Sequence, residues 1–206
     1  MRTIDPPHPS PHPPTAFTPP PDACDAHCHV FGPAARFPFS PDRAYTPPDS
    51  GIDEFERLQH RLGLSRAVFV QASCHGTDNA AMVDALERGG GRYAGVAMID
   101  ESFSYGDIAR LHDAGVRGTR FNFVAHLGGA PDLAVFWRLV DRVQPFDWHI
   151  VLHFDAKDLP HYADLLDRMP CAYVIDHMAR VPVTAGVAQE PFQYLLELMR
   201  DERCWV

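Results

Sequence analysis

Short apolar runs alternate with segments of helical periodicity along most of this chain. Several runs, such as Ala67-Val68-Phe69-Val70, are continuously apolar, which is typical of strands buried on both faces of a sheet. The expected strands are 22–30, 66–72, 93–99, 116–123, 148–154 and 172–176, with a seventh that begins at Cys204. Between them, apolar residues recur at helical spacing, as at Ile52, Phe55, Leu58 and Leu62, and this spacing predicts helices.

Glycine and aspartate mark the ends of the expected helices. Gly63, Gly89 and Gly115 lie where a helix C-terminus favours a left-handed residue, and Asp107 and Asp158 lie near expected helix starts. An alternating order of strand and helix implies a parallel sheet with right-handed crossovers. The predicted fold is therefore α/β, either an open doubly wound sheet or a (β/α)8 barrel.

Polar and ionisable residues follow or close these strands. They are His27, His29, Ser73, His75, Arg120, Asn122, His153, His177 and Arg180. In a barrel the strand ends converge on one mouth, where the active sites of this fold lie. No GxGxxG or GxxxxGKS/T pattern follows the first strand, which weakens a nucleotide-binding hypothesis. The pattern favours an incomplete TIM barrel of about six full βα units plus the start of strand seven.

Composition and charge narrow the class of protein. A net charge of -9 argues against a nucleic-acid partner, and no apolar run is long enough to span a bilayer. Residues 1–21 contain nine prolines and no apolar signal segment, so we expect a disordered or surface-hugging arm ahead of one domain at 22–206. The five cysteines form no CxxC pair, which is typical of a reduced, cytoplasmic protein.

The pair His27 and His29 carries the most specific chemistry. Residues at i and i+2 on a strand project from the same face, so both rings can bind one divalent metal or one carbonyl oxygen. Arg120 and Arg180 carry planar guanidinium groups that fit a carboxylate with two hydrogen bonds. The alternative for each arginine is a structural ion pair.

Longer motifs occur in order from about Asp22 to the last residue. They are Asp25-Ala26-His27-Cys28-His29-Val30-Phe31-Gly32-Pro33, Arg43-Ala44-Tyr45-Thr46-Pro47, Val70-Gln71, His75-Gly76-Thr77-Asp78-Asn79, Arg117-Gly118-Thr119-Arg120-Phe121-Asn122-Phe123 and Asp176-His177-Met178-Ala179-Arg180. These motifs resemble those of the amidohydrolase superfamily. Within it they are similar to the branch of 2-pyrone-4,6-dicarboxylate lactonases and related dicarboxylate-lactone hydrolases.

The resemblance implies a distorted barrel of amidohydrolase type that opens a small, carboxylate-bearing lactone in the breakdown of lignin-derived aromatics, without a metal. It assigns His27, His29 and His177 to the lactone carbonyl. It places Arg120 and Arg180 on the substrate carboxylates, with Tyr45 and Ser73 lining the pocket. We add His75, His126 and His153 as further candidate substrate contacts, and His153 stands where this branch has no histidine ligand. His126 stands where this branch uses an arginine, so the exact lactone stays open.

A metal site is the alternative for the same histidines. The only lysine of the chain, Lys157, does not lie on the expected strand four, which excludes a lysine-bridged pair of metals. His153 at the end of strand five would complete three nitrogen ligands with His27 and His29, suited to one Zn or Mn. The protein would then be a metal-dependent hydrolase or decarboxylase of the same superfamily.

The length of the chain raises a further expectation. A barrel of this type takes roughly 250 residues, and the aspartate that the resemblance places after strand eight as the general base has no counterpart in the 206 residues. We therefore expect a truncated chain with little hydrolase activity, and an inactive remnant is a third hypothesis. The sequence does not indicate an oligomeric state.

Overall fold

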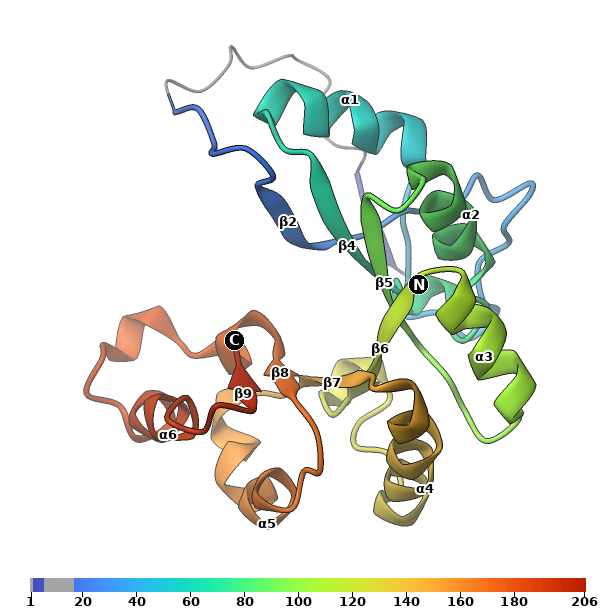
Figure 1. Ribbon diagram of the computed structural model, residues 1–206. Helices are drawn as coiled ribbons and strands as arrows, with labels where there is room; N and C mark the ends of the chain where they lie inside the picture. The colour runs from blue at the N-terminus through green and yellow to red at the C-terminus, as the bar shows by residue number, and fades with distance from the viewer. Residues whose placement is uncertain (1, 6–16) are drawn as a thin grey trace. The chain divides into compact units, whose positions relative to one another are not determined.

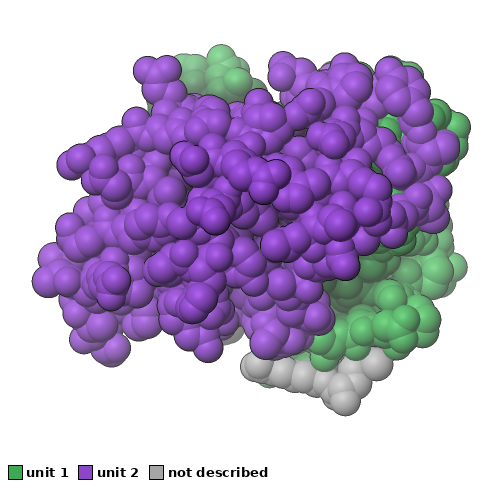
Figure 2. Space-filling model, turned by 90° about the horizontal axis from the view of Figure 1, so that it is seen from below, with its two compact units in different colours: residues 1–100, 106–116 green, residues 101–105, 117–206 purple. Residues whose placement is uncertain are grey.

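The computed structural model describes residues 2–5 and 17–206 (Figure 1). The chain divides into two compact units, which Figure 2 colours separately. Unit 1 comprises residues 1–100 and 106–116, and unit 2 comprises residues 101–105 and 117–206. Each unit is built from parallel strands and the helices that connect them, and each is described by itself.

Unit 1 contains three parallel strands in the order β2-β4-β5, namely β2 (Cys24–Cys28), β4 (Arg66–Val70) and β5 (Tyr93–Ala97). Its helices are α1 (Ile52–Leu62), α2 (Ala80–Gly89) and nearly all of α3 (Tyr105–Asp113), with a short 3-10 helix η1 (Ser73–His75) after β4. The pairing of β2 with β4 shifts register between Asp25 and Cys28, which marks an irregularity next to the histidine pair.

Aromatic rings fill the core of unit 1. Phe69 of β4 lies with its ring centroid 4.8 Å from that of Phe55 on α1 and 5.0 Å from that of Tyr93 on β5. The hydroxyl of Tyr93 donates to Gln59 Oε1 at 2.8 Å, so the one polar atom of this cluster is satisfied. Gly89 ends α2 directly against the Tyr93 ring, where any side chain would collide with it. Helix α2 and strand β5 thus pack closely because Gly89 has no Cβ.

Unit 2 contains β6 (Val116–Asn122, counted from 117), β7 (His149–His153), β8 (Tyr173–Ile175) and β9 (Cys204–Trp205), parallel and in that order. Its helices are α4 (Leu133–Val143), α5 (Ala163–Asp167) and α6 (Glu190–Leu198). Five 3-10 segments connect these elements: η2 (Ala125–Leu127), η3 (Gln144–Phe146), η4 (Ala156–Tyr162), η5 (Asp176–Arg180) and η6 (Val183–Ala185). The core is apolar and aromatic, with Phe136, Trp148 and Phe154 fully buried.

The predicted strands are confirmed, each within a few residues of its expected bounds, and the pairings given within each unit are parallel. Gly63 caps α1 in the left-handed conformation at φ 72°, as expected. The cap of α2 is Gly90 rather than Gly89, and Asp158 lies in the 3-10 segment η4 rather than at the start of an α-helix. Pro160 explains the latter, because it removes a backbone donor inside that segment.

The predicted disordered arm at 1–21 falls mainly on residues 1 and 6–16, which lie outside the described residues. At its start, however, Arg2 and Thr3 form β1 (Arg2–Thr3), which pairs in parallel with β3 (Tyr45–Thr46). Backbone groups of β3 thus offer the start of the arm hydrogen-bond partners ahead of its prolines, and the rest of the arm stays a prediction. Over the residues that the structure describes, no helix combines the length and the apolar character that a membrane crossing requires.

Candidate active site

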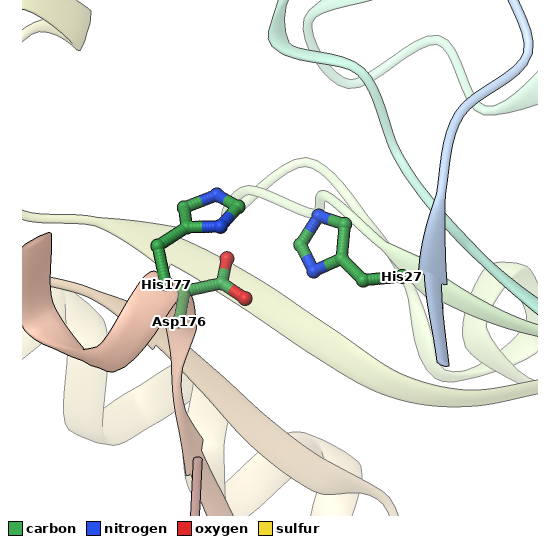
Figure 3. A group of neighbouring side chains, drawn as sticks. All are labelled: His27, Asp176 and His177. Atoms are coloured by element: carbon green, nitrogen blue, oxygen red, sulfur yellow. The ribbon is translucent and has the colours of Figure 1, made fainter. Parts of the chain in front are cut away.

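In unit 1 the end of β2 presents the histidine pair. The ring centroids of His27 and His29 lie 5.1 Å apart, with the ring planes nearly perpendicular. His29 Nδ1 lies 2.7 Å from the carbonyl oxygen of Val70 on the neighbouring strand β4. A carbonyl only accepts, so Nδ1 carries the proton and the neutral ring keeps its lone pair on Nε2. Figure 3 shows His27 projecting from β2.

Tyr45 and Ser73, both predicted to line the substrate pocket, come together in unit 1. The Tyr45 hydroxyl is within hydrogen-bonding reach of Ser73 and of Cys74, and burial raises the pKa of the phenol. The group is therefore a neutral phenol at physiological pH. It can donate or accept a hydrogen bond, which suits the lining of a polar pocket.

His75, a predicted substrate contact, has both ring nitrogens against backbone groups. Its Nδ1 lies 3.2 Å from the carbonyl oxygen of Pro38, and its Nε2 accepts from the amide of Gly32 at 3.3 Å. Burial lowers the pKa of this imidazole, which keeps it neutral and able to make both bonds. Because backbone groups occupy both nitrogens, His75 ties the loop after β2 to the loop after β4.

Two amide side chains hold the same loop, a role that the sequence analysis missed. Gln71 donates to the carbonyl oxygens of Gly76 and Asp78 at 3.1 and 2.8 Å. Asn79 donates to the carbonyl of Met98 at 2.9 Å and accepts from its amide at 3.1 Å. Both side chains are buried, so much of the motif at 75–79 specifies a loop conformation rather than substrate contacts.

In unit 2 Arg120 is the centre of a buried polar cluster. Its Nη2 lies 2.7 Å from Asp176 Oδ2 and 3.1 Å from His153 Nδ1, and all three residues are at most 5% exposed. The ion pair with Asp176 is the structural alternative that the sequence left open for Arg120. It leaves the Nε–H of Arg120 buried and without a hydrogen-bond partner among the described residues.

The contact with Arg120 fixes the tautomer of His153. A guanidinium only donates, so Nδ1 must hold the lone pair and Nε2 the proton. The carboxamide of Asn122, 3.2 Å from Nδ1, can turn its NH2 group toward the same lone pair. Burial, followed by the charge of Arg120, lowers the pKa of His153 to about 4. His153 is therefore a neutral donor, and its buried Nε2–H has no partner within the described chain.

His177 begins a left-handed turn at the end of β8. The residues from His177 to Arg180 have φ values of 54°, 49°, 51° and 55°, although none of them is glycine. This conformation costs roughly 1 kcal/mol or more for each residue, and such strain is concentrated at functional sites. Figure 3 shows Asp176 and His177 projecting from adjacent positions there, and the His177 ring centroid lies 5.1 Å from that of His153.

His126 and Arg180 also come together in unit 2, with Asp155 as a third member. Arg180 Nε lies 3.2 Å from Asp155 Oδ1, and Arg180 Nη1 lies 3.4 Å from both ring nitrogens of His126. Arg180 thus contacts the His126 ring and the Asp155 carboxylate with different nitrogens of one guanidinium. Asp155 follows a strand end, and the rule that selected the other residues would have included it.

The histidines proposed for a metal do not all fit one. His29 has the hydrogen bond that many metal-ligating histidines make, because its Nδ1–H is held by the carbonyl oxygen of Val70. His153 does not fit. A metal on its Nε2 would move the proton to Nδ1, where it would face an N–H of Arg120.

A family model described as amidohydrolase matches residues 24–206. The chain is 46% identical over 187 residues to a 2-pyrone-4,6-dicarboxylate hydrolase of Comamonas testosteroni, covering 91% of this chain and 61% of that protein. It is 38% identical over 194 residues to a 4-sulfomuconolactone hydrolase of Hydrogenophaga intermedia, covering 94% and 64%. The chain thus spans less than two thirds of the length of these relatives.

Solved structures give the fold. A probable 2-pyrone-4,6-dicarboxylic acid hydrolase of Acinetobacter baumannii, with citric acid bound, has a TM-score of 0.78 at 25% identity, covering 89% of this chain and 68% of that one. A putative hydrolase of the same acid from Pseudomonas putida has a TM-score of 0.77 at 31% identity, covering 90% and 67%. The fold is a partial TIM barrel, as predicted. Since the family model matches nearly all of the sequence, the chain belongs to the amidohydrolase family.

Proposed function

We propose that this protein hydrolyses a lactone that carries carboxylate groups, with 2-pyrone-4,6-dicarboxylate as the reference substrate. The observation that carries the proposal is the buried pair of unpartnered donors, Arg120 Nε–H and His153 Nε2–H. Neither group can accept a hydrogen bond in this arrangement, so the pair suits an anionic oxygen. The 46% identity to a hydrolase of that dicarboxylate supports the same substrate class.

In the proposed reaction, water adds to the lactone carbonyl carbon, and the bond from that carbon to the ring oxygen breaks. The products are a carboxylate and a hydroxyl group, and one proton is released. Charge develops on the carbonyl oxygen before the ring opens, so groups that donate to it accelerate the step. From the resemblance we assign His27, His29 and His177 to this oxygen. His29 donates from Nε2 when its ring is protonated, because Nδ1–H is already bound to Val70.

The base that takes the proton from water is not assigned to a residue described here. Asp176 is the buried carboxylate of unit 2, and its charge is committed to Arg120 at 2.7 Å. A carboxylate engaged in a buried ion pair with a guanidinium is poorly placed to take a proton from water. We therefore treat Asp176 as the partner that orients Arg120.

The test uses binding and turnover of 2-pyrone-4,6-dicarboxylate by the purified protein. His153→Phe keeps a ring of similar size and removes both nitrogens, so we expect binding to weaken by roughly 10- to 100-fold. Arg117→Gln on the same strand β6 is the matched control for Arg120→Gln, because Arg117 is exposed. We expect a large loss for Arg120→Gln and little change for Arg117→Gln.

A second lactone, which carries a sulfonate, tests which acidic group the substrate bears. The relative from Hydrogenophaga intermedia is named for 4-sulfomuconolactone, so this compound is the competing substrate in the same assay. The proposal would be wrong if the protein bound neither lactone. It would also be wrong if His153→Phe and Arg120→Gln bound the dicarboxylate as tightly as the parent protein.

A further inference from the structure

Arg180 is the more accessible of the two arginines at the strand ends of unit 2. Its side chain is 43% exposed, whereas that of Arg120 is 5% exposed and already paired with Asp176. Arg180 has a carboxylate of its own, because Asp155 Oδ1 lies 3.2 Å from its Nε. The guanidinium of Arg180 is therefore already paired with a carboxylate of the protein, that of Asp155.

The fold holds this pair in place. Asp155 lies two residues beyond β7, and Arg180 lies within the left-handed turn that follows β8. These strands are paired neighbours, with Leu152 opposite Ile175, so their ends project at the same edge of the sheet. The strained turn and the contact with the His126 ring further restrict the guanidinium. The pairing is thus set by the register of two strands.

The Asp155 side chain does not make the capping hydrogen bond that is common at its position. It occupies the N-cap position of η4, where an aspartate commonly accepts a hydrogen bond from a backbone amide of the first turn. Here its side chain makes no capping bond, and the carboxylate oxygen faces Arg180 instead. The capping bond given up is a local interaction that any N-cap aspartate can form. Its absence indicates that the contact with Arg180 determines where this carboxylate points.

We propose that Asp155 is a built-in competitor for Arg180, which an anionic group of the substrate must displace. This inference rests on the proposed function, because it assumes that Arg180 binds a substrate anion. The exchange replaces one carboxylate by another, so a neutral lactone gains nothing at Arg180. Both partners are partly exposed, and such pairs contribute little free energy. Displacement therefore weakens anion binding only about three- to tenfold.

The test measures binding of citrate, a tricarboxylate, to the 206-residue protein by isothermal titration calorimetry. Citrate is chosen because the related structure from Acinetobacter baumannii contains citric acid. We expect Asp155→Asn to tighten citrate binding about three- to tenfold. Asp158→Asn in the same segment η4 makes the same charge change at a carboxylate that is not the ion-pair partner of Arg180, and should have a smaller effect. Asp155→Glu restores the carboxylate and should return the affinity toward that of the parent protein.

A double-mutant cycle that combines Asp155→Asn with Arg180→Gln shows whether Asp155 acts through Arg180. In the Arg180→Gln background, we expect Asp155→Asn to give no gain beyond that of Asp158→Asn. The inference is overturned if Asp155→Asn binds citrate no more tightly than Asp158→Asn does, or if its gain persists without Arg180. Circular dichroism checks folding, and Asp155→Ser replaces the asparagine variant if that variant does not fold.

The outcomes separate this inference from the proposed function. If parent and Asp155→Asn proteins bind citrate and the lactone with equal affinity, the competitor role is wrong and the lactone-binding site stands. If neither ligand binds to the parent protein or to any variant, the anion site is absent, and both proposals are overturned. Tighter binding confined to Asp155→Asn with Arg180 present supports both.

Discussion

His153 should make the stability of this protein depend on pH in a defined range. Its pKa is about 4 in the folded state, compared with 6.5 for an unperturbed histidine, chiefly because the ring is buried. The unfolded chain therefore takes up a proton over a range in which the folded chain does not. The contribution of His153 to the free energy of unfolding is fully present above pH 6.5, and it is lost as the pH falls from 6.5 toward 4.

The magnitude follows from the shift. A difference of 2.5 pKa units (6.5 minus about 4) corresponds to about 3 kcal/mol at roughly 1.4 kcal/mol per unit. The perturbation is His153→Asn, which keeps an acceptor for Arg120 and cannot be protonated in this range. The free energy of unfolding of the parent protein should exceed that of the variant by a margin that shrinks by about 3 kcal/mol between pH 7.5 and pH 4.

The assay is urea unfolding at several pH values, followed by circular dichroism, for the parent protein, His153→Asn and the control His161→Asn. His161 is exposed and controls for the loss of a histidine as such. Comparing the variant with the parent cancels the effects of carboxylates that titrate equally in both. A margin that stays constant from pH 7.5 to pH 4 would refute the assignment of His153 as a buried neutral ring.

Three further variants test the packing around the site. Asp176→Asn breaks the buried pair with Arg120 and should lower the free energy of unfolding in urea by about 3–5 kcal/mol, whereas replacing both residues by apolar ones should recover much of that loss. A loss below 1 kcal/mol would argue that the pair is accessible to water. Gly118→Ala would place a methyl group 2.6 Å from His149 Cε1 and should cost about 1–3 kcal/mol, measured as a lower Tm; an unchanged Tm would show that the ring can move. Asn79→Ala removes the side-chain partner of the Met98 amide and carbonyl beyond β5, which should lower the free energy of unfolding by about 1–3 kcal/mol. It should also accelerate hydrogen exchange of the Met98 amide, and unaltered exchange would contradict this role.

Strands and site positions were predictable from the sequence to different degrees. The apolar runs located the strands of the two units within a few residues, except β1 and β3, because buried parallel strands leave a continuous hydrophobic signal. Strand ends then selected His27, Arg120, His153 and His177 without any knowledge of contacts. The arm was harder to predict, since the pairing of β1 with β3 joins segments about forty residues apart and leaves no local pattern.

The roles of these residues depended on contacts that spacing does not encode. His75 has the same strand-end position as His153, yet backbone groups occupy both of its nitrogens, whereas His153 keeps a buried N–H without a partner among the described residues. Arg120 looked like a substrate anchor; its Nη2 is shared between Asp176 and His153, whereas its Nε–H has no hydrogen-bond partner among the described residues. Which hydrogen bond a ring or a guanidinium makes is decided by atoms from other strands.

The sequence by itself determined the α/β fold, the order of the elements and the set of polar residues at the strand ends, because periodicity and apolar runs are local properties of the chain. Only the tertiary structure decided which of those residues are committed to the protein and which keep a donor to offer. That decision rests on distances between neighbouring strands, on burial and on the left-handed turn at 177–180. Each of these arises when segments far apart in sequence pack together, and desolvation then makes every unmet hydrogen bond energetically important.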